Sequence, residues 1–226
     1  MSENSMNGFL LVSKPVGLTS FQVVRKVRYL TQVKRVGHAG TLDPFASGLL
    51  VLALGRAFTR RISEIQDLKK TYTVTMVVGI ETDTLDSYGN ITSQVDTVSL
   101  PEFDLQDFVG PHDQLPPQHS AKKIGGKRSY DMARAGQFVE HKPASVEIYK
   151  IDLLSTHAAR YPHIQFRVEC SKGTYVRSLV RDIGARLGYP CYAKDLVRDA
   201  VGSYINSDAV PYDGLSANTI QEHLFV

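Results

Sequence analysis

Cysteine is scarce in this chain, whose 226 residues include only Cys170 and Cys191. Two thiols are too few for a disulfide framework or a cysteine-rich zinc site, and they fit a reducing compartment. Long hydrophobic runs are also missing, since the apolar run at residues 49–54 is far too short to span a bilayer. Residues 1–7 lack the apolar segment of a signal peptide. We therefore predict a cytoplasmic protein without a membrane segment.

Cofactor and metal motifs are absent as well. The sequence has no glycine-rich loop of the nucleotide-binding type, no metal-ligand cluster and no internal repeat. Asp83 and Asp86 form a carboxylate pair in a turn region, but no further oxygen ligands follow at the spacing of a calcium loop. We expect the protein to need neither a metal nor a cofactor.

Charge is unevenly distributed along the chain. The formal net charge is only +3, yet residues 81–121 hold eight of the 23 acidic residues and no Lys or Arg. The remainder is therefore much more basic than the whole. Such a remainder can supply a phosphate-binding face, although scattered solvated charges would give the same composition.

Hydrophobic periodicity predicts both strands and helices. Alternating or short apolar runs predict strands at residues 9–12, 49–54, 72–80, 145–154, 164–170 and 200–205. Helices are predicted at residues 20–30 with Ser20 as N-cap, 57–65, 102–109, 129–135, 174–187 with Thr174 as N-cap, and near the C-terminus. The mixed, non-alternating order indicates an α+β fold, with helices flanking a mixed, largely antiparallel central sheet.

One loop carries the chemical interest of the sequence. Residues 37–48 read GHAGTLDPFASG, in which Asp43 is the only carboxylate and three glycines and a proline disfavour a helix or strand. Lys34 and Arg35 precede it. An acid, a histidine and nearby cations suit work on an anionic polymer. The same loop is also typical of a turn in which Asp43 only accepts backbone N–H groups.

This string, from Gly37 through Leu49, resembles the catalytic signature of the TruB family of tRNA pseudouridine synthases. Further segments resemble other elements of the family: Lys14-Pro15 with Gly17, Thr19 and Ser20, Tyr72 after Lys69-Lys70-Thr71, and residues 170–177. The resemblance covers nearly the whole chain. It implies the pseudouridine synthase fold and an isomerase that flips a uridine, breaks its glycosidic bond and rejoins the base through carbon.

The resemblance also implies roles for individual residues. Asp43 would be the essential catalytic group, Arg177 its ionic partner, and Tyr72 the residue that stacks on the flipped base and assists proton transfer. Leu196 would line the uracil pocket, and His38 would help to displace the base. The full set of residues expected to contact the substrate is His38, Thr41, Lys14, Leu196, Lys34, Arg35, Lys122, Lys123, Lys127 and Arg128. Without the resemblance, Tyr72 would be an ordinary strand aromatic, Leu196 a core residue and Arg177 a solvated helix residue.

The domain organisation follows from the same comparison. We expect a single catalytic domain over residues 1–226, with an RNA-gripping insertion at about residues 111–143. His119 departs from the family, in which a tyrosine is expected. We expect the small C-terminal RNA-binding domain of the PUA type to be absent, because only about a helix follows Tyr212.

The expected partner is tRNA, recognised by its T-arm stem-loop, and the expected reaction is pseudouridine formation at the uridine of the TΨC loop. We expect a monomer. Two alternatives remain open: a relative of the RNA-guided type that acts on other RNA, and a non-catalytic RNA-binding or chaperone protein that keeps the fold.

Overall fold

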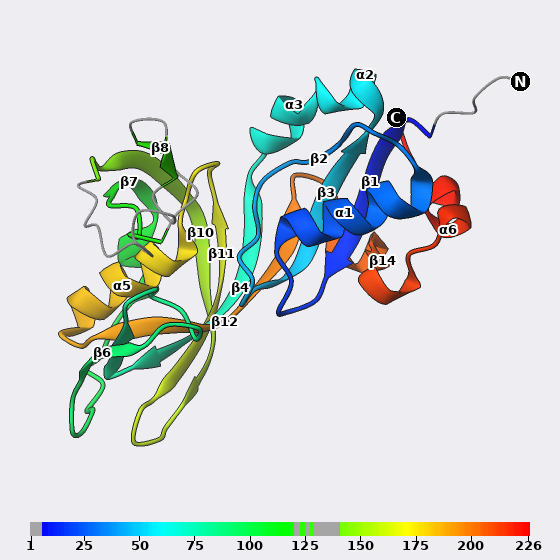
Figure 1. The fold of residues 1–226 in the computed structure, drawn as a ribbon. Helices are drawn as coiled ribbons and strands as arrows, with labels where there is room; N and C mark the ends of the chain where they lie inside the picture. Colours follow the sequence, from blue (N-terminus) through cyan, green and yellow to red (C-terminus); the bar gives the residue numbers. More distant parts are fainter. Residues whose placement is uncertain (1–5, 120–122, 125–126, 129–140) are drawn as a thin grey trace, which may run out of the picture. The chain divides into compact units, whose positions relative to one another are not determined.

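The structure is a computed structural model that describes residues 6–119, 123–124, 127–128 and 141–226 (Figure 1). The chain divides into two compact units, residues 1–72 with 197–226 and residues 73–196. It passes from the first unit to the second within β4 (Lys70–Val78) and returns within β12 (Cys191–Val201). The single catalytic domain expected for this chain stays a prediction.

The first unit is built on a mixed sheet with strand order β14-β1-β3-β12, in which β2 also pairs with β3 and β13 with β12. β1 and β3 are antiparallel, whereas β12 runs parallel to β3 and β14 parallel to β1. The other elements have these bounds: β1 Gly8–Lys14, β2 Val36–His38, β3 Ser47–Leu54, β13 Tyr204–Ile205, β14 Val210–Pro211, α1 Ser20–Thr31, α2 Gly55–Thr59, α3 Ile62–Gln66 and α6 Ala217–Glu222.

Helices cover both faces of this sheet (Figure 1). Successive side chains of a strand point to opposite faces, so β1 places Leu10 and Phe9 in different buried clusters. The Leu10 cluster includes residues of α1 and α6, whereas the Phe9 cluster includes residues of α2 and α3. Phe9 meets Phe58 of α2 edge to face, with ring centroids 5.2 Å apart. Because helices cover both of its faces, β3 is buried along almost its whole length.

The second unit contains the strand order β4-β11-β10-β7, and β10 is antiparallel to both β11 and β7. Its further bounds are β5 Ile80–Thr82, β6 Ile91–Gln94, β7 Gly110–Gln114, β8 Lys123–Ile124, β9 Lys127–Arg128, β10 Ala144–His157, β11 His163–Cys170 and α5 Val176–Leu187. The alternate residues of β11 from Ile164 to Cys170 are fully buried. α5 lies so close to β12 that a Cβ on Gly184 would meet the Cys191 Sγ at 2.7 Å.

The mixed, largely antiparallel sheet confirms the predicted fold class, and several boundaries differ from the prediction. The helix expected at residues 57–65 is two short helices, α2 and α3, interrupted at Arg60 and Arg61. The helix expected at residues 102–109 is only a 3₁₀ turn, Leu105–Phe108. The strand expected at residues 200–205 is a hairpin of β12 and β13, because Gly202, with a φ of 58°, and Ser203 form a turn between them.

Two further predictions concerned the insertion and a helix start. The expected insertion begins inside the sheet, since Gly110–Gln114 pairs with β10, and its helix at residues 129–135 lies outside the described residues. α5 begins at Val176 with Tyr175 as N-cap, because the Thr174 hydroxyl donates to the Ser171 carbonyl instead of capping the helix. Within the described residues, no helix combines the length and apolar character that crossing a bilayer requires.

The sequence predicts Ser20 as the N-cap of α1, but the structure shows that the N-cap is Thr19. The Thr19 hydroxyl accepts a hydrogen bond from the Gln22 N–H at 3.2 Å, and the Gln22 side chain accepts one from the Thr19 N–H at 2.7 Å. This reciprocal pair is a capping box, which satisfies two of the otherwise unpaired donors at the helix start. Ser20 is thereby free for a different contact, described below.

We predict that Thr19→Ala lowers the free energy of unfolding by about 1 kcal/mol, because a capping hydroxyl is lost. Thr19→Ser keeps the hydroxyl and should remain close to the original stability. Urea unfolding followed by circular dichroism measures both variants. Equal stability of the alanine and serine variants would contradict the capping role.

Candidate active site

The Asp43 loop connects β2 to β3 and is held at both ends by backbone hydrogen bonds. Before Asp43, the Ala39 N–H donates to the Val51 carbonyl of β3 at 2.9 Å. After it, the Ala46 N–H donates to the Asp43 carbonyl at 3.1 Å, and the Pro44 carbonyl accepts from Gly17 at 2.7 Å. Asp43 itself is half-buried. The loop is therefore a fixed turn that presents one carboxylate.

Lys14, at the end of β1, lies buried beside this loop. Its ammonium donates to the carbonyls of Pro15 at 2.9 Å, Leu18 at 2.8 Å and Ala46 at 2.5 Å. Burial lowers the pKa of Lys14 to about 8, while the Asp43 carboxylate raises it and Arg198 lowers it further. The side chain is only 1% exposed. This placement favours a positioning role for Lys14 over the substrate contact that was expected.

Arg198, on β12, is a second buried cation next to the loop, and no local pattern in the sequence indicates this contact. Its guanidinium donates to the carbonyls of Leu49 at 2.6 Å and of Gly40 and Thr41 at 3.3 Å each. Its backbone runs against Gly48, where an added Cβ would meet the Arg198 carbonyl oxygen at 2.4 Å. Gly48 also has a φ of 104°, a conformation that strongly favours glycine. Together these contacts fix the stretch that carries Asp43.

Ser20 supplies a third contact to the loop. Its hydroxyl accepts a hydrogen bond from the Leu42 N–H at 2.8 Å and donates to the Leu42 carbonyl at 3.0 Å. Leu42 is buried and directly precedes Asp43. The first turn of α1 therefore sets the backbone position of the catalytic candidate.

His38 lies on β2, paired with Leu52 of β3. Burial is the largest cause that lowers its pKa, and the charge of Arg198 lowers it further. Its Nδ1 is buried without a hydrogen-bond partner in the described part of the chain. A ring with a lowered pKa is mostly uncharged near neutral pH. An uncharged ring is better suited to stack on a base than to bind a phosphate, so we favour stacking as the role of His38.

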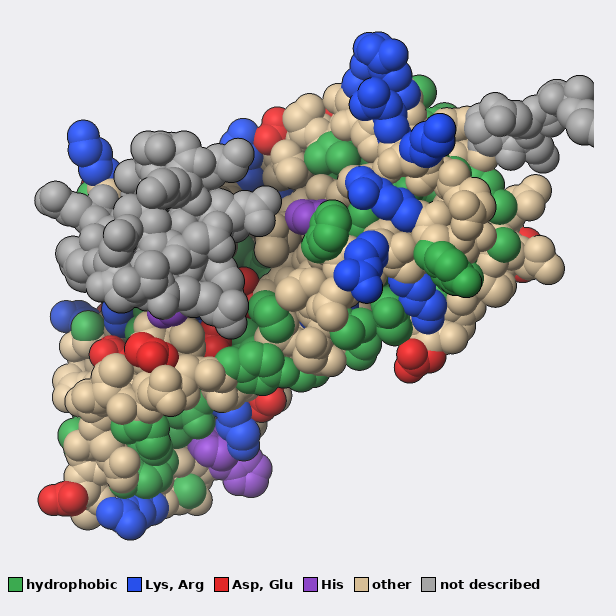
Figure 2. Space-filling model, viewed as in Figure 1, with side chains coloured by type: hydrophobic (Ala, Val, Ile, Leu, Met, Phe, Trp, Pro, Cys, Tyr) green, Lys and Arg blue, Asp and Glu red, His purple; other side chains and the backbone are tan. Residues whose placement is uncertain are grey.

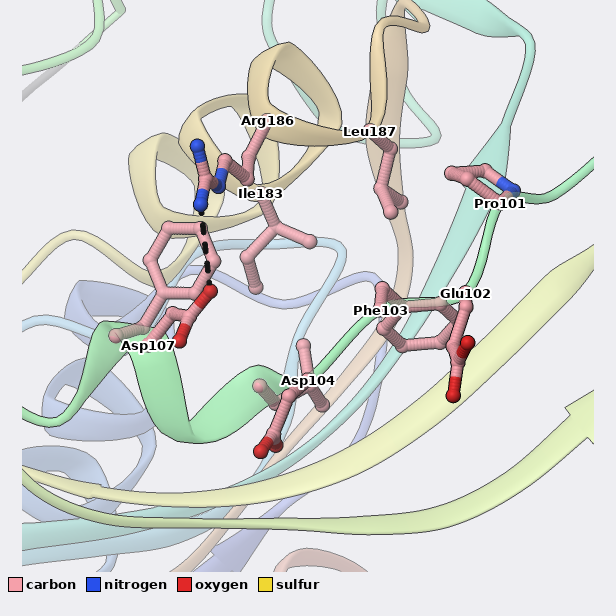
Figure 3. Close-up of a pocket in the computed structure, with 10 residues that line it drawn as sticks. Pro101, Glu102, Phe103, Asp104, Asp107, Ile183, Arg186 and Leu187 are labelled. Carbon is pink, nitrogen blue, oxygen red and sulfur yellow. Dashed lines mark ion pairs between the residues drawn. The ribbon is translucent and has the colours of Figure 1, made fainter.

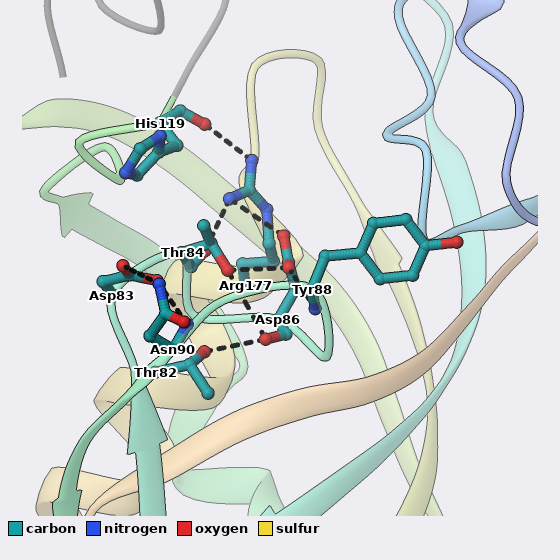
Figure 4. A network of polar contacts seen from close by, with 8 residues as sticks. All are labelled: Thr82, Asp83, Thr84, Asp86, Tyr88, Asn90, His119 and Arg177. Carbon is teal, nitrogen blue, oxygen red and sulfur yellow. Dashed lines mark hydrogen bonds and ion pairs between the residues drawn. The ribbon is translucent and has the colours of Figure 1, made fainter. Parts of the chain in front are cut away.

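In the second unit, Arg177 of α5 is the centre of a buried polar network (Figure 4). Its Nη1 lies 3.3 Å from the Asp86 carboxylate and donates to the Thr84 carbonyl at 2.6 Å, and its Nη2 donates to the His119 carbonyl at 2.8 Å. The side chains of Arg177 and Asp86 are 5% and 9% exposed. Arg177 is therefore not the solvated helix residue that the sequence alone suggested.

Asp86, considered above only as half of a possible metal pair, is the counter-ion of Arg177 in this network. Its Oδ1 accepts from the Thr84 hydroxyl at 2.7 Å and from the Tyr88 N–H at 3.0 Å, which leaves Oδ2 for Arg177. Asp83, its neighbour in the turn, accepts instead from Asn90. Among the described residues, no group of three or more His, Cys, Asp or Glu is placed to hold a metal ion.

The remaining predicted residues lie as follows. Tyr72 is half-buried on β4, Leu196 is buried on β12, and Thr41 is exposed in the loop. Lys34 and Arg35 are exposed before β2 and line a shallow groove with Arg28. Lys123, Lys127 and Arg128 belong to the β8–β9 hairpin, whereas Lys122 lies outside the described residues. The pairing of Arg177 with Asp43 stays a prediction.

Comparison with known proteins identifies close relatives. The model of the TruB family pseudouridylate synthase N-terminal domain matches residues 28–176. A tRNA pseudouridine synthase B of Dehalococcoides mccartyi is 43% identical over 94% of this chain and 71% of its own length. Another, from Thermosipho melanesiensis, is 44% identical over 91% of this chain and 67% of its own length.

Solved structures confirm the fold. A chain of a Cbf5-Nop10-Gar1 complex matches with a TM-score of 0.68 and 25% identity, over 95% of this chain and 58% of that chain. A chain of an archaeal box H/ACA Nop10-Cbf5 complex matches with a TM-score of 0.66 and 22% identity, over 96% of this chain and 58% of that chain. This chain thus spans less than two thirds of each of those longer chains.

The coupling of Lys14 to Asp43 can be measured directly. The Asp43 carboxylate favours the charged ammonium, so Asp43→Asn should lower the pKa of Lys14 below its value of about 8. A pH titration of the lysine Cε chemical shift by NMR reports this pKa. Asp208→Asn, at an exposed position of the same unit, should leave it unchanged. A constant or raised Lys14 pKa in the Asp43 variant would contradict the coupling.

Proposed function

The chain belongs to the TruB family of pseudouridylate synthases, and on this premise we propose that it converts uridine to pseudouridine in tRNA. The observation that carries the proposal is the Asp43 loop. Its carboxylate is presented from a turn whose backbone is bonded to Lys14, Arg198 and Ser20. A catalytic carboxylate needs such a fixed position, because small displacements of reacting groups cost large factors in rate.

The reaction rearranges bonds without a net change in oxidation state. The bond between the ribose and the uracil nitrogen breaks, the base turns, and a bond forms between the same ribose carbon and C5 of uracil. The proton of C5 is lost and the released nitrogen gains one. The target base must leave its stack to reach the carboxylate. Asp43 starts the glycosidic cleavage as nucleophile or base, and either role requires its ionised form.

Arg177 is our second catalytic candidate, by its match to the family. Three acceptors orient its planar guanidinium: the Asp86 carboxylate and the carbonyls of Thr84 and His119. Asp86 is then a positioning residue, since it acts through Arg177. Tyr72 and Leu196 complete the set as the residues that stack on and enclose the base.

We propose that RNA binding rests on Lys and Arg side chains from two segments of the chain. Lys34 and Arg35 precede the catalytic loop, and no ion pair in the described part of the chain involves either side chain. Lys122, Lys123, Lys127 and Arg128 in the insertion are the further phosphate contacts. We propose that the substrate is the uridine of the TΨC loop in the T-arm, and that the protein acts as a cytoplasmic monomer.

The names of the relatives support this function over an RNA-guided one. Two proteins named tRNA pseudouridine synthase B are 43% and 44% identical to this chain over more than nine tenths of its length. A non-catalytic RNA-binding role would not need the ordered Asp43 loop and the buried Arg177 network together. These observations support the tRNA enzyme as the first function to test.

The first test removes the charge of Asp43. Asp43→Asn nearly conserves shape, so tRNA binding should persist, whereas turnover should fall to less than about 1% of the original rate because the carboxylate itself is lost. Release of tritium from uridine-5-³H in an unmodified tRNA transcript and in an isolated T-arm stem-loop measures the loss of the C5 proton. Asp208→Asn is the control and should keep full activity. Substantial turnover by the Asp43 variant would exclude Asp43 as the catalytic group.

The second test separates orientation from charge at Arg177. Arg177→Lys keeps the positive charge but replaces the planar fork with a single ammonium, so kcat should fall on the order of a hundredfold through misplacement. Arg181→Lys, one turn later on α5 and partly exposed, is the matched control. Thermal unfolding of both variants shows whether the Arg177 variant is folded. A near-normal kcat for a folded Arg177→Lys enzyme would rule out the proposed role.

A further inference from the structure

The outer face of α1 exposes aromatic side chains that the fold does not use. Phe21 is 56% exposed and Tyr29 is 77% exposed. The opposite face of the helix buries Val23, Val24 and Val27 in the core. Phe21, Arg25 and Tyr29 follow one another at a spacing of four residues, so they form one stripe on the helix surface. Exposed aromatics aligned on a rigid helix indicate a binding surface.

The segment that carries this stripe has charge of one sign. Residues 4–42 contain no Asp or Glu, and their basic residues are Lys14, Arg25, Lys26, Arg28, Lys34 and Arg35. Figure 2 shows Lys and Arg side chains gathered over the surface around α1. No ion pair in the described part of the chain involves Arg25. The guanidinium is therefore available to an external anion.

Beside the stripe lies a hollow of 420 Å³ whose lining combines rings and cations. Its lining residues are Leu18, Gln22, Arg25, Lys26, Tyr29 and Tyr212. Lys26 lies 4.0 Å above the Tyr212 ring and donates to the Tyr212 carbonyl at 2.7 Å, which fixes both side chains. Tyrosine faces bind bases by stacking, and Arg and Lys bind phosphates.

The stripe continues toward the basic groove described above. Arg28 lies 6.0 Å from the Phe21 ring centroid, and it donates to the Val36 carbonyl at 2.7 Å. Its side chain also lines the groove that Lys34 and Arg35 border. Aromatic and basic side chains thus alternate from the hollow to the residues just before the catalytic loop.

We propose that the hollow between Tyr29 and Tyr212 holds an unpaired nucleotide of the bound RNA, outside the nucleotide that reacts. The base stacks on a tyrosine ring and the adjoining phosphate pairs with Arg25 and Lys26. This inference rests on the proposed function for the presence of RNA, and it adds a second contact for that same substrate.

A pocket in the second unit provides a contrast (Figure 3). It measures 260 Å³ and its lining includes Glu102, Asp104 and Asp107. Among the described residues that line it, the one cation is Arg186, which lies 3.5 Å from the Asp107 carboxylate. Three carboxylates repel a phosphate, so this pocket has the wrong charge for RNA. The hollow beside α1 has aromatic rings together with the right charge.

A single fluorescent residue tests the proposal, because the chain contains no tryptophan. Tyr29→Trp places the only indole at the rim of the hollow. We expect an unmodified tRNA transcript to quench its fluorescence, whereas Tyr149→Trp, at an exposed strand position of the second unit, should not respond. Equal quenching by uridine monophosphate at the same nucleotide concentration would overturn the assignment to RNA. So would a change that follows protein concentration without RNA, since it would indicate a second copy of the chain.

Binding measurements complete the test and separate it from the function. Arg25→Ala with Tyr29→Ala should raise the Kd for the tRNA transcript about fivefold or more, since one stacked base and one phosphate contact are lost. The log–log salt slope should flatten by about 0.7–0.9. Arg160→Ala, an exposed cation of the second unit, is the control. Unchanged Kd and slope in an enzyme that still forms pseudouridine would overturn this inference alone. If the unmutated protein forms no pseudouridine in the transcript, the proposed function is refuted instead.

Discussion

Two buried cations hold the Asp43 loop, and the candidate site of the first unit depends on them. A buried charge is costly unless hydrogen bonds satisfy it. Lys14 and Arg198 meet this requirement with backbone carbonyls, several of them from the loop itself. The need to satisfy the cations therefore fixes the loop. An irregular, glycine-containing segment gains the rigidity of the strands on either side of it.

The second unit also contains a buried cation that is bonded to backbone carbonyls. Arg177 also binds backbone carbonyls, but the Asp86 carboxylate lies beside it as a counter-ion. Breaking such a buried pair leaves an uncompensated charge, which is more costly than the loss of one hydrogen bond. Arg177 therefore has a well-defined orientation. In both units an arginine from a regular element donates to carbonyls of a turn, those of Gly40 and Thr41 in the first unit and that of Thr84 in the second.

The distribution of charge agrees with a polyanionic substrate. Acidic residues gather in residues 81–121, where they take part in turns and line a pocket of the second unit. The segment from β1 to the catalytic loop is free of them. A surface of one sign raises the local concentration of an oppositely charged ligand. The chain thus presents cations along α1 and before the loop, and within residues 4–48 Asp43 is the only carboxylate.

The fold class, the strands β1, β3, β4, β10 and β11, and the Asp43 loop could be predicted from the sequence, because they depend on local periodicity and a contiguous motif. Only the tertiary structure revealed Arg198, the contact of Ser20 with Leu42, and the pairing of Asp86 with Arg177. The reason is physical: Arg198 reaches the Leu49 carbonyl across 149 residues of chain, and strand pairing alone brings them together. The local sequence pattern predicts which residues are buried. The partner of a buried polar group depends on how distant segments of the chain pack together.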